Sequence, residues 1–343
     1  MAIRKLRPPK IVSVGKQKQL VKGSEFALNA ANKRVMVDNL TRRSAQFAGD
    51  TAARGADWYK SAQKDAYHVG SGDADVGASV LSILSGKTNY QVNRQMALHL
   101  MTLTPEHISA IQQHADISKS INKLPGGKKH PDAAPMIAHA EALRSSVVNG
   151  TPLAYTPSHT ILRAHKVLTG ELHPLNVFGA VGVKGQRLAG PKKQFDFAGQ
   201  IRSGGKFDDF APIDTHAYDA AMDSVDIPYG TANEHMKTGP TYDFVHDAYK
   251  KALTKSISMG HVPEGTTLGQ YQAMHWVHHQ TLKAESRPSV LSGMVSQQEG
   301  ALKYAAAMPH LDPKTHGLDP IEPSQAIVDR VSHFAAGSGE GRR

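Results

Sequence analysis

Residues 188–223 contain the pattern on which the fold prediction depends, and they read LAGPKKQFDFAGQIRSGGKFDDFAPIDTHAYDAAMD. A Gly-Pro pair opens a helical segment that carries two lysines, and proline is well tolerated in the first turn of a helix. A Gly-rich loop follows, and a second helix starts at Ile213-Asp214-Thr215-His216. Aspartate is favoured at such a start, where the helix dipole keeps its carboxylate ionised. The stretch therefore predicts two helices joined by a loop, with charged side chains at both starts.

Helical spacing of apolar residues continues on both sides of this stretch. Upstream, a short apolar helix over 76–84 ends at Ser85-Gly86, Asn89 is placed to cap the next helix, and Thr104-Pro105 marks a further helix start. Other helices are predicted over 134–149, 157–169, 174–180 (weakly), 192–201, 213–223, 240–259, 264–285, 290–308 and 323–335. No strand-like alternation extends beyond four residues. The sequence therefore predicts an all-α fold of about nine to eleven helices.

Charge is unevenly distributed along the chain. The 343 residues include 40 Lys and Arg against 30 Asp and Glu, for a formal net charge of +10. Residues 1–64 contain 14 of these cations and four of the acids, so the whole surplus lies in this region. We interpret residues 1–22 as a flexible basic arm. A basic surplus of this kind favours a polyanionic partner such as nucleic acid.

Composition excludes several classes of protein. The chain has no cysteine, which excludes a disulfide scaffold, a thiolate metal site and a cysteine nucleophile. No apolar run approaches the roughly 20 residues that span a bilayer, and no apolar segment follows the charged N-terminus as it would in a secretory signal. We therefore expect a cytoplasmic protein without a cofactor and without a membrane partner.

These observations divide the chain into four parts. We expect a basic arm and short polar helices over 1–57, and a helical body over 58–285 that begins at Trp58-Tyr59. C-terminal helices are expected over 286–336 and a disordered tail over 337–343.

Two motifs of residues 188–223 resemble the core of the helix-hairpin-helix DNA glycosylases. In that superfamily a hairpin of the type Leu-Pro-Gly-x-Gly-x-Lys precedes a Val-Asp-Thr-His motif. The hairpin motif corresponds here to Leu188-Ala189-Gly190-Pro191-Lys192, which lacks the second glycine. The Val-Asp-Thr-His motif corresponds to Ile213-Asp214-Thr215-His216. More specifically, the chain is similar over residues 58–285 to glycosylase-like proteins of actinobacteriophages. Their remaining motifs match Trp58-Tyr59, Val76 to Leu84 with Asn93, Gly190 to Lys193 with Phe195 or Phe197, Asp214 to Ala217, and Gln272-Ala273-Met274-His275-Trp276.

The resemblance implies a helix-hairpin-helix body that binds double-stranded DNA and acts on a flipped base. It implies that Asp214 stabilises the oxocarbenium-like sugar and activates a nucleophile, and that Lys192, when it acts, attacks the sugar carbon. DNA contacts are then expected from a set of basic and hairpin residues: Gly190, Lys192, Lys193, His216, Arg42 and Arg43. The candidates for stacking on the base are Trp276, Tyr59 and Tyr218.

Each assignment has a plainer alternative. Asp214 is also a good helix cap, the lysines at 192 and 193 are also ordinary surface charges, and Trp276 and Gln272 lie on an apolar helix face that favours core packing. His275, His278 and His279 have the composition of a metal site, but His278 is offset from the face of the other two and no acid lies within a turn of them. The sequence therefore predicts no metal.

The leading hypothesis is a DNA glycosylase-like protein that excises a base from DNA, acting in the host cytoplasm if phage-encoded. One alternative is a phage enzyme of DNA base hypermodification. The other is a non-catalytic DNA-binding or virion-associated structural protein.

Overall fold

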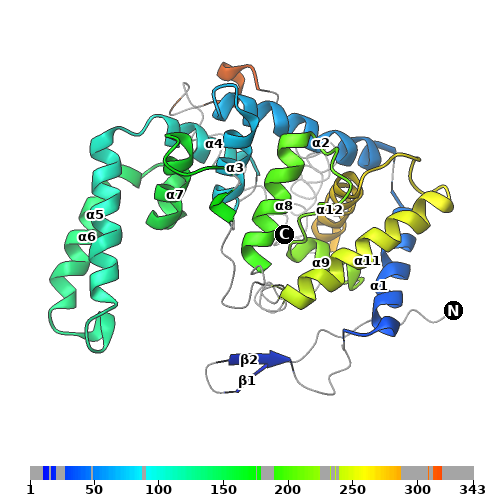
Figure 1. The fold of residues 1–343 in the computed structure, drawn as a ribbon, viewed down its shortest axis with the longest axis horizontal. Coiled ribbons are helices and arrows are strands. Elements are labelled where there is room, and N and C mark those ends of the chain that lie inside the picture. Colours follow the sequence, from blue (N-terminus) through cyan, green and yellow to red (C-terminus); the bar gives the residue numbers. More distant parts are fainter. Residues whose placement is uncertain are drawn as a thin grey trace, which may run out of the picture. The chain divides into compact units, whose positions relative to one another are not determined.

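The computed structural model describes residues 11–14, 17–20, 28–47, 49–86, 90–174, 176–178, 189–224, 232, 236, 239–286, 308 and 312–318. The chain divides into two compact units. The first unit comprises Met1–Gln63, Phe178–Val295 and Glu322–Arg343, and the second comprises Lys64–Val177 and Ser296–Ile321. Both units are helical, which confirms the all-α class (Figure 1).

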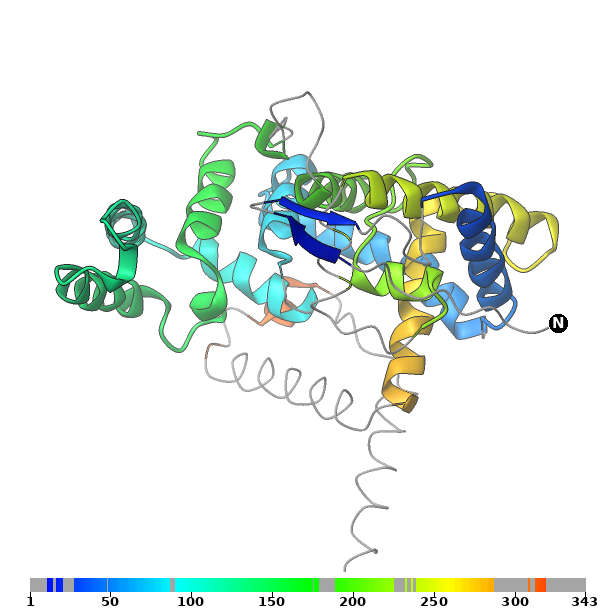
Figure 2. The ribbon, with the colours of Figure 1, turned by 90° about the horizontal axis from the view of Figure 1, so that it is seen from below.

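The first unit is built from six helices of the described chain. They are α1 (Ala30–Ser44), the N-terminal part of α2 (Gly49–Val69), α8 (Ala189–Ser203), α9 (Thr215–Ala221), α11 (Gly239–Ser258) and α12 (Leu268–Ser286). The longest contact is between α1 and α11, which lie side by side in both views, and the short α9 packs on α12 (Figures 1 and 2). Helices that are distant in sequence therefore surround α9, the helix that begins after Asp214.

Large buried side chains from four of these helices form the core of the first unit. Four of these side chains are completely buried: Leu40 of α1, Tyr218 of α9, Tyr249 of α11 and Tyr271 of α12. Burying such a side chain contributes about 1.5–3 kcal/mol relative to leaving it exposed. This core fixes α9 against α12 and α11.

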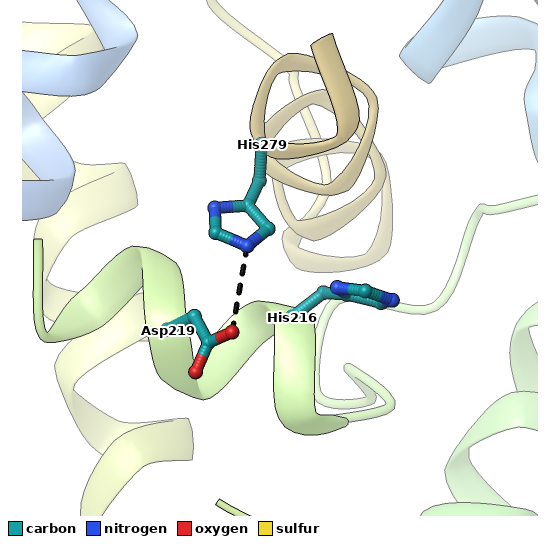
Figure 3. A group of neighbouring side chains, drawn as sticks. All are labelled: His216, Asp219 and His279. Carbon is teal, nitrogen blue, oxygen red and sulfur yellow. Dashed lines mark ion pairs between the residues drawn. The ribbon is translucent and has the colours of Figure 1, made fainter. Parts of the chain in front are cut away.

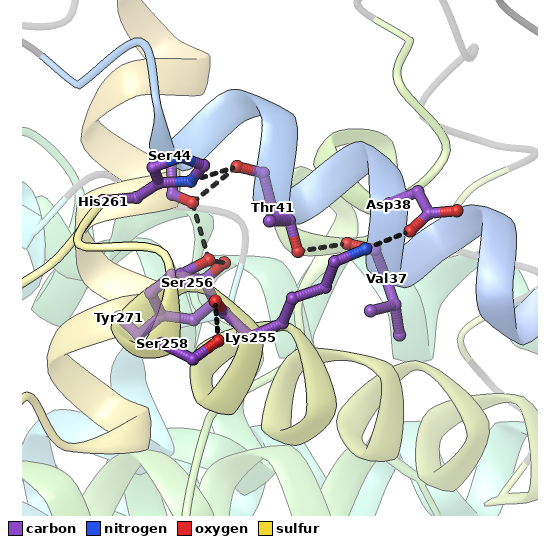
Figure 4. Close-up of polar contacts among 9 residues, drawn as sticks. All are labelled: Val37, Asp38, Thr41, Ser44, Lys255, Ser256, Ser258, His261 and Tyr271. Atoms are coloured by element: carbon purple, nitrogen blue, oxygen red, sulfur yellow. Dashed lines mark hydrogen bonds and ion pairs between the residues drawn. The ribbon is translucent and has the colours of Figure 1, made fainter.

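A polar ladder joins α1 to α11 and α12 beside this core (Figure 4). The hydroxyls of Ser44 and Ser256 share a hydrogen bond of 2.7 Å, and Ser256 shares a second one of 2.9 Å with the Tyr271 hydroxyl. On the outer side, Lys255 Nζ lies 2.7 Å from Asp38 Oδ1. The buried hydroxyls satisfy one another, as polar groups inside a core must.

The second unit contains five complete helices of the described chain. They are α3 (Ala74–Leu84), α4 (Tyr90–Met101), α5 (Pro105–Ile121), α6 (Ala133–Val148) and α7 (Ser158–Leu168). The 3₁₀ turns are η1 (Gly127–Lys129), η2 (Pro152–Tyr155), η3 (Asn176–Phe178, at the boundary with the first unit) and η5 (Pro313–His316). α5 and α6 form a long antiparallel pair, and α3 packs against α7 (Figure 1).

Local signals account for the helix starts of the second unit. Asp73 caps α3 by accepting hydrogen bonds from the backbone N–H groups of Asp75 and Val76. Thr104 caps α5 in a reciprocal arrangement with His107, with Pro105 in the first turn. Inside the unit, the fully buried Arg94 Nε lies 3.0 Å from Asp65 Oδ2. This ion pair joins α4 to the C-terminal part of α2.

The predicted helices between residues 76 and 285 are present within a few residues of their expected ends, except that 174–180 contains only the short turn η3. The expected start of the body at Trp58 falls inside α2. Asn89, the segment at 323–335 and the tail at 337–343 lie outside the described residues, as does 290–308 except for its last residue.

The N-terminal arm, predicted to be flexible, contains a short β-hairpin. β1 (Ile11–Val14) pairs antiparallel with β2 (Gln17–Leu20), with Ile11 opposite Leu20 (Figure 2). Each strand has only four residues, which is too short a run for alternation to identify it.

Candidate functional site

Asp214 is the N-cap of α9, the helix at the centre of the site. Its backbone is extended, and its Oδ1 accepts a hydrogen bond of 2.8 Å from the Ala217 backbone N–H. The residue is half-buried. The capping role proposed as the plain alternative is therefore present, and it fixes the direction of the carboxylate.

Tyr242 of α11 holds the chain immediately before Asp214. Its buried hydroxyl lies 2.5 Å from Asp196 Oδ2 of α8 and accepts a hydrogen bond of 3.2 Å from the Ile213 backbone N–H. Burial, followed by the nearby Asp196 carboxylate, raises the pKa of Tyr242 well above its usual range. The hydroxyl therefore stays protonated, and it connects α8 and α11 to the start of α9.

Tyr59 of α2 lies near both of these carboxylates. It is 1% exposed, and its hydroxyl donates a hydrogen bond of 3.2 Å to Gln272 Oε1. Burial raises the pKa of Tyr59 well above its usual range, and the negative charges of Asp214 and Asp196 raise it further. Asp214 therefore lies within electrostatic reach of an aromatic ring that the sequence analysis had singled out.

Tyr59 belongs to a group of four aromatic side chains that we call the aromatic cluster: Trp58, Tyr59, Phe197 and Trp276. The Trp58 ring centroid lies 4.7 Å from that of Tyr59, 5.8 Å from that of Phe197 and 6.0 Å from that of Trp276. All but Tyr59 are half-buried, so they keep exposed ring surface. Two of the predicted stacking residues, Tyr59 and Trp276, are thus brought together by Trp58.

The third predicted stacking residue does not share this environment. Tyr218 is completely buried in the core of the first unit, and its hydroxyl pKa is raised by burial. Neither its ring nor that of Tyr59, which is also buried, has surface to offer to a base.

Lys192, in the first turns of α8, is half-buried and forms an ion pair with Asp243 of α11. Its Nζ also lies 5.3 Å from the centroid of the Tyr242 ring. Lys192 therefore lies at the ring of Tyr242, whose hydroxyl accepts the backbone N–H of Ile213, the residue before Asp214. A nucleophilic role requires Asp243 to release the amino group.

The remaining predicted DNA contacts differ in accessibility. Gly190 lies in the first turn of α8, and Lys193 and His216 are half-buried. Arg42 is partly exposed, with Nη2 2.6 Å from Asp223 Oδ2. Arg43 is 4% exposed, and it lies 3.2 Å from Asp223 Oδ1 through Nε and 3.3 Å from His279 Nδ1 through Nη1. The expectation that Arg43 contacts DNA is therefore not supported, because its guanidinium is enclosed by protein.

The histidines of α12 have different surroundings. His275 is completely buried with its ring against Tyr249 and Tyr271, and burial lowers its pKa well below the usual value. His279, one turn later, faces Asp219 of α9 instead. The trio considered in the sequence is therefore not a ligand set.

Sequence reasoning missed Asp196 and Tyr242 as members of this site. The available signal for Asp196 was an acid between Phe195 and Phe197 inside a predicted helix, where a polar residue between two aromatic ones indicates a buried hydrogen bond. Nothing local marks Tyr242, whose partners lie 29 to 46 residues earlier in the chain.

No family model, no curated protein and no solved structure matches this chain. The likeness to the glycosylases therefore rests on the motifs and on their order. Within the described part of the chain, every helix is too short or too polar to cross a membrane.

Proposed function

We propose that the first unit binds DNA and acts on an unstacked base, with Asp214 as the residue that assists cleavage of the N-glycosidic bond. The observation that carries this proposal is the fixed direction of the Asp214 carboxylate, whose Oδ1 accepts the Ala217 backbone N–H at 2.8 Å, in the unit that also contains the aromatic cluster. A carboxylate held in one direction and aromatic rings for the base are groups that base excision requires.

The aromatic cluster supplies surface for the base. Trp58, Phe197 and Trp276 are half-buried, so each ring is held by packing while part of it stays accessible. An extruded base is bound by stacking on such rings, and stacking is worth about 1–3 kcal/mol per base.

The carboxylate supplies the charge. Departure of the base leaves positive charge on the sugar, which a nearby carboxylate stabilises. The hydrogen bond from the Ala217 backbone N–H orients the Asp214 carboxylate. The carboxylate therefore has a fixed direction before substrate arrives.

A non-catalytic DNA-binding protein is the second candidate. It is favoured by the two contacts that already occupy the proposed chemical groups, the cap made by Asp214 and the ion pair made by Lys192. In this case the basic residues of the region 1–64 contact the phosphates of DNA, and no N-glycosidic bond is cleaved.

The variant Asp214→Asn separates the two candidates. Asparagine caps a helix as well as aspartate does, so α9 should be preserved while the negative charge is lost. Wild type and variant are incubated with duplexes that carry a panel of damaged or modified bases, and free base and abasic sites are measured. We expect release by wild type and a loss of at least about a hundredfold in the variant.

The matched control is Asp208→Asn, an exposed aspartate in the loop between α8 and α9. It removes the same charge near the site and should leave release unchanged. Release that is equal in both variants would contradict the role of Asp214. The absence of release from every duplex, together with salt-dependent DNA binding, would leave the non-catalytic candidate. Borohydride trapping of a covalent adduct by wild type but not by Lys192→Ala would show that Lys192 acts as the nucleophile.

A further inference from the structure

His216, Asp219 and His279 lie close together inside the first unit. His216 and Asp219 project from α9, three residues apart on one face, and His279 reaches toward them from α12 (Figure 3). One ligand atom of each lies within 4.8 Å of those of the other two. Asp219 and His279 are buried, and His216 is half-buried.

We propose that these three side chains bind a single divalent transition-metal ion, with zinc as the ion of reference. Two imidazoles and one carboxylate form a ligand set that zinc and the neighbouring first-row metals prefer. The proposal is independent of the function proposed for Asp214, since it concerns binding of an ion and needs no DNA.

The distances allow this assignment with small side-chain movements. Ligand atoms around a tetrahedral zinc ion at about 2.0–2.1 Å are separated from one another by about 3.4 Å. His279 Nε2 and Asp219 Oδ2 are already 3.6 Å apart. The ring centroids of His216 and His279 lie 5.6 Å apart, so the more exposed His216 ring must also move to complete the set.

The third donor distinguishes this group from an ordinary buried ion pair. Asp219 Oδ2 and His279 Nε2 face each other at 3.6 Å, and a second histidine, His216, stands on the same face of α9 as Asp219. Three protein ligands leave a fourth position on zinc for water or another small ligand. His216 is the half-buried member, and the ion therefore enters from its side.

The test measures zinc binding by the full-length protein. The chain is stripped of metal and titrated with zinc chloride in the presence of a chromophoric chelator, which competes with weak binding by the 19 histidines. We expect one zinc ion per chain. His216→Ala and Asp219→Asn should each weaken the binding by more than about tenfold, and His139→Ala, which alters an exposed histidine of α6, should not change it.

Cobalt provides a measurement that needs no variant. Four- or five-coordinate Co²⁺ bound by wild type should absorb visible light far more strongly than hydrated Co²⁺, and addition of zinc should abolish this absorption. The proposal is overturned if wild type shows no such absorption and retains no zinc against the chelator. It is also overturned if both site variants, checked by circular dichroism for intact helices, retain zinc as wild type does.

Discussion

The hydroxyl of Tyr242 lies 2.5 Å from Asp196 Oδ2, and the same oxygen accepts the backbone N–H of Ile213. One buried atom thus joins α8, α11 and the residue before Asp214. The position of the proposed catalytic carboxylate depends on this hydroxyl, although Tyr242 itself stands 28 residues later in the chain.

Replacing Tyr242 by phenylalanine tests this relationship. The ring is kept, but Asp196 and Ile213 lose a hydrogen-bonding partner in a buried place, and we expect unfolding to become easier by about 1–3 kcal/mol. Urea denaturation followed by circular dichroism measures the change. Tyr67→Phe, at an exposed tyrosine of α2, should stay within about 0.5 kcal/mol of wild type. Equal effects of the two variants would contradict the positioning role of Tyr242.

Stability should fall at alkaline pH because of the buried tyrosines. Burial raises the pKa values of Tyr59, Tyr242 and Tyr249 well above their usual range, and that of Tyr271 to about 12. The unfolded chain loses these protons near pH 10 while the folded chain keeps them, so the free energy of unfolding decreases as pH rises above about 10. Below about pH 10 the buried tyrosines make their full contribution to the free energy of unfolding.

Urea denaturation at pH 8, 10 and 11, with tyrosinate absorbance recorded in parallel, measures this loss. Ionisation of the buried tyrosines should coincide with loss of helicity. Complete ionisation near pH 10 with the helices intact would show that these hydroxyls are accessible to solvent.

The second unit offers a test of its buried ion pair. Arg94→Ala removes the charge that faces Asp65 at a site where both side chains are buried, and we expect a loss of about 3–5 kcal/mol in the free energy of unfolding. The double variant Asp65→Leu/Arg94→Met replaces both charges with apolar side chains and should recover most of that loss. If the double variant is no more stable than Arg94→Ala, the attraction between Asp65 and Arg94 itself stabilises the fold. The loss in Arg94→Ala would then not be due to a buried charge left without a partner.

Arg43 contacts His279, one of the ligands of the proposed metal site. Its Nη1, a donor, lies 3.3 Å from Nδ1, so the proton of a neutral His279 ring must reside on Nε2, the atom that faces Asp219. Metal binding at Nε2 needs the opposite tautomer, and Arg43 must therefore withdraw. Glutamine at position 43 can instead accept a hydrogen bond from Nδ1–H, as the partners of metal-bound histidines do.

We therefore expect Arg43→Gln to bind zinc more tightly than wild type, by up to about tenfold in the chelator competition. Circular dichroism controls for loss of the contact between Arg43 and Asp223. Unchanged or weaker binding in a folded variant would contradict the tautomer assigned to the metal-free His279.

Helix positions could be predicted because their signals are local. Asp73, Thr104 and Asp214 each cap a helix by hydrogen bonds to backbone groups no more than three residues away, and the caps are recognisable from residue type and spacing. The hairpin of Ile11–Val14 and Gln17–Leu20 was missed because its strands are too short to show alternation.

Members of the site that depend on packing could not be predicted. Arg43 was expected to contact DNA, and only the packing of α1 against the rest of the first unit shows that it is buried. The metal hypothesis was set aside because no acid stands near His279 in sequence. The acid that it faces, Asp219, stands 60 residues earlier.

By itself, the sequence determined the helical class, the starts and ends of most helices and the presence of Asp214 at a helix start, because these depend on residues within one or two turns. Only the tertiary structure decided which side chains are enclosed and which of them meet. Tyr242 with Asp196, Trp58 with Trp276, and Asp219 with His279 are brought together by helices that pack through a shared apolar core. Such packing selects partners by shape and burial, and these have no fixed spacing along the chain.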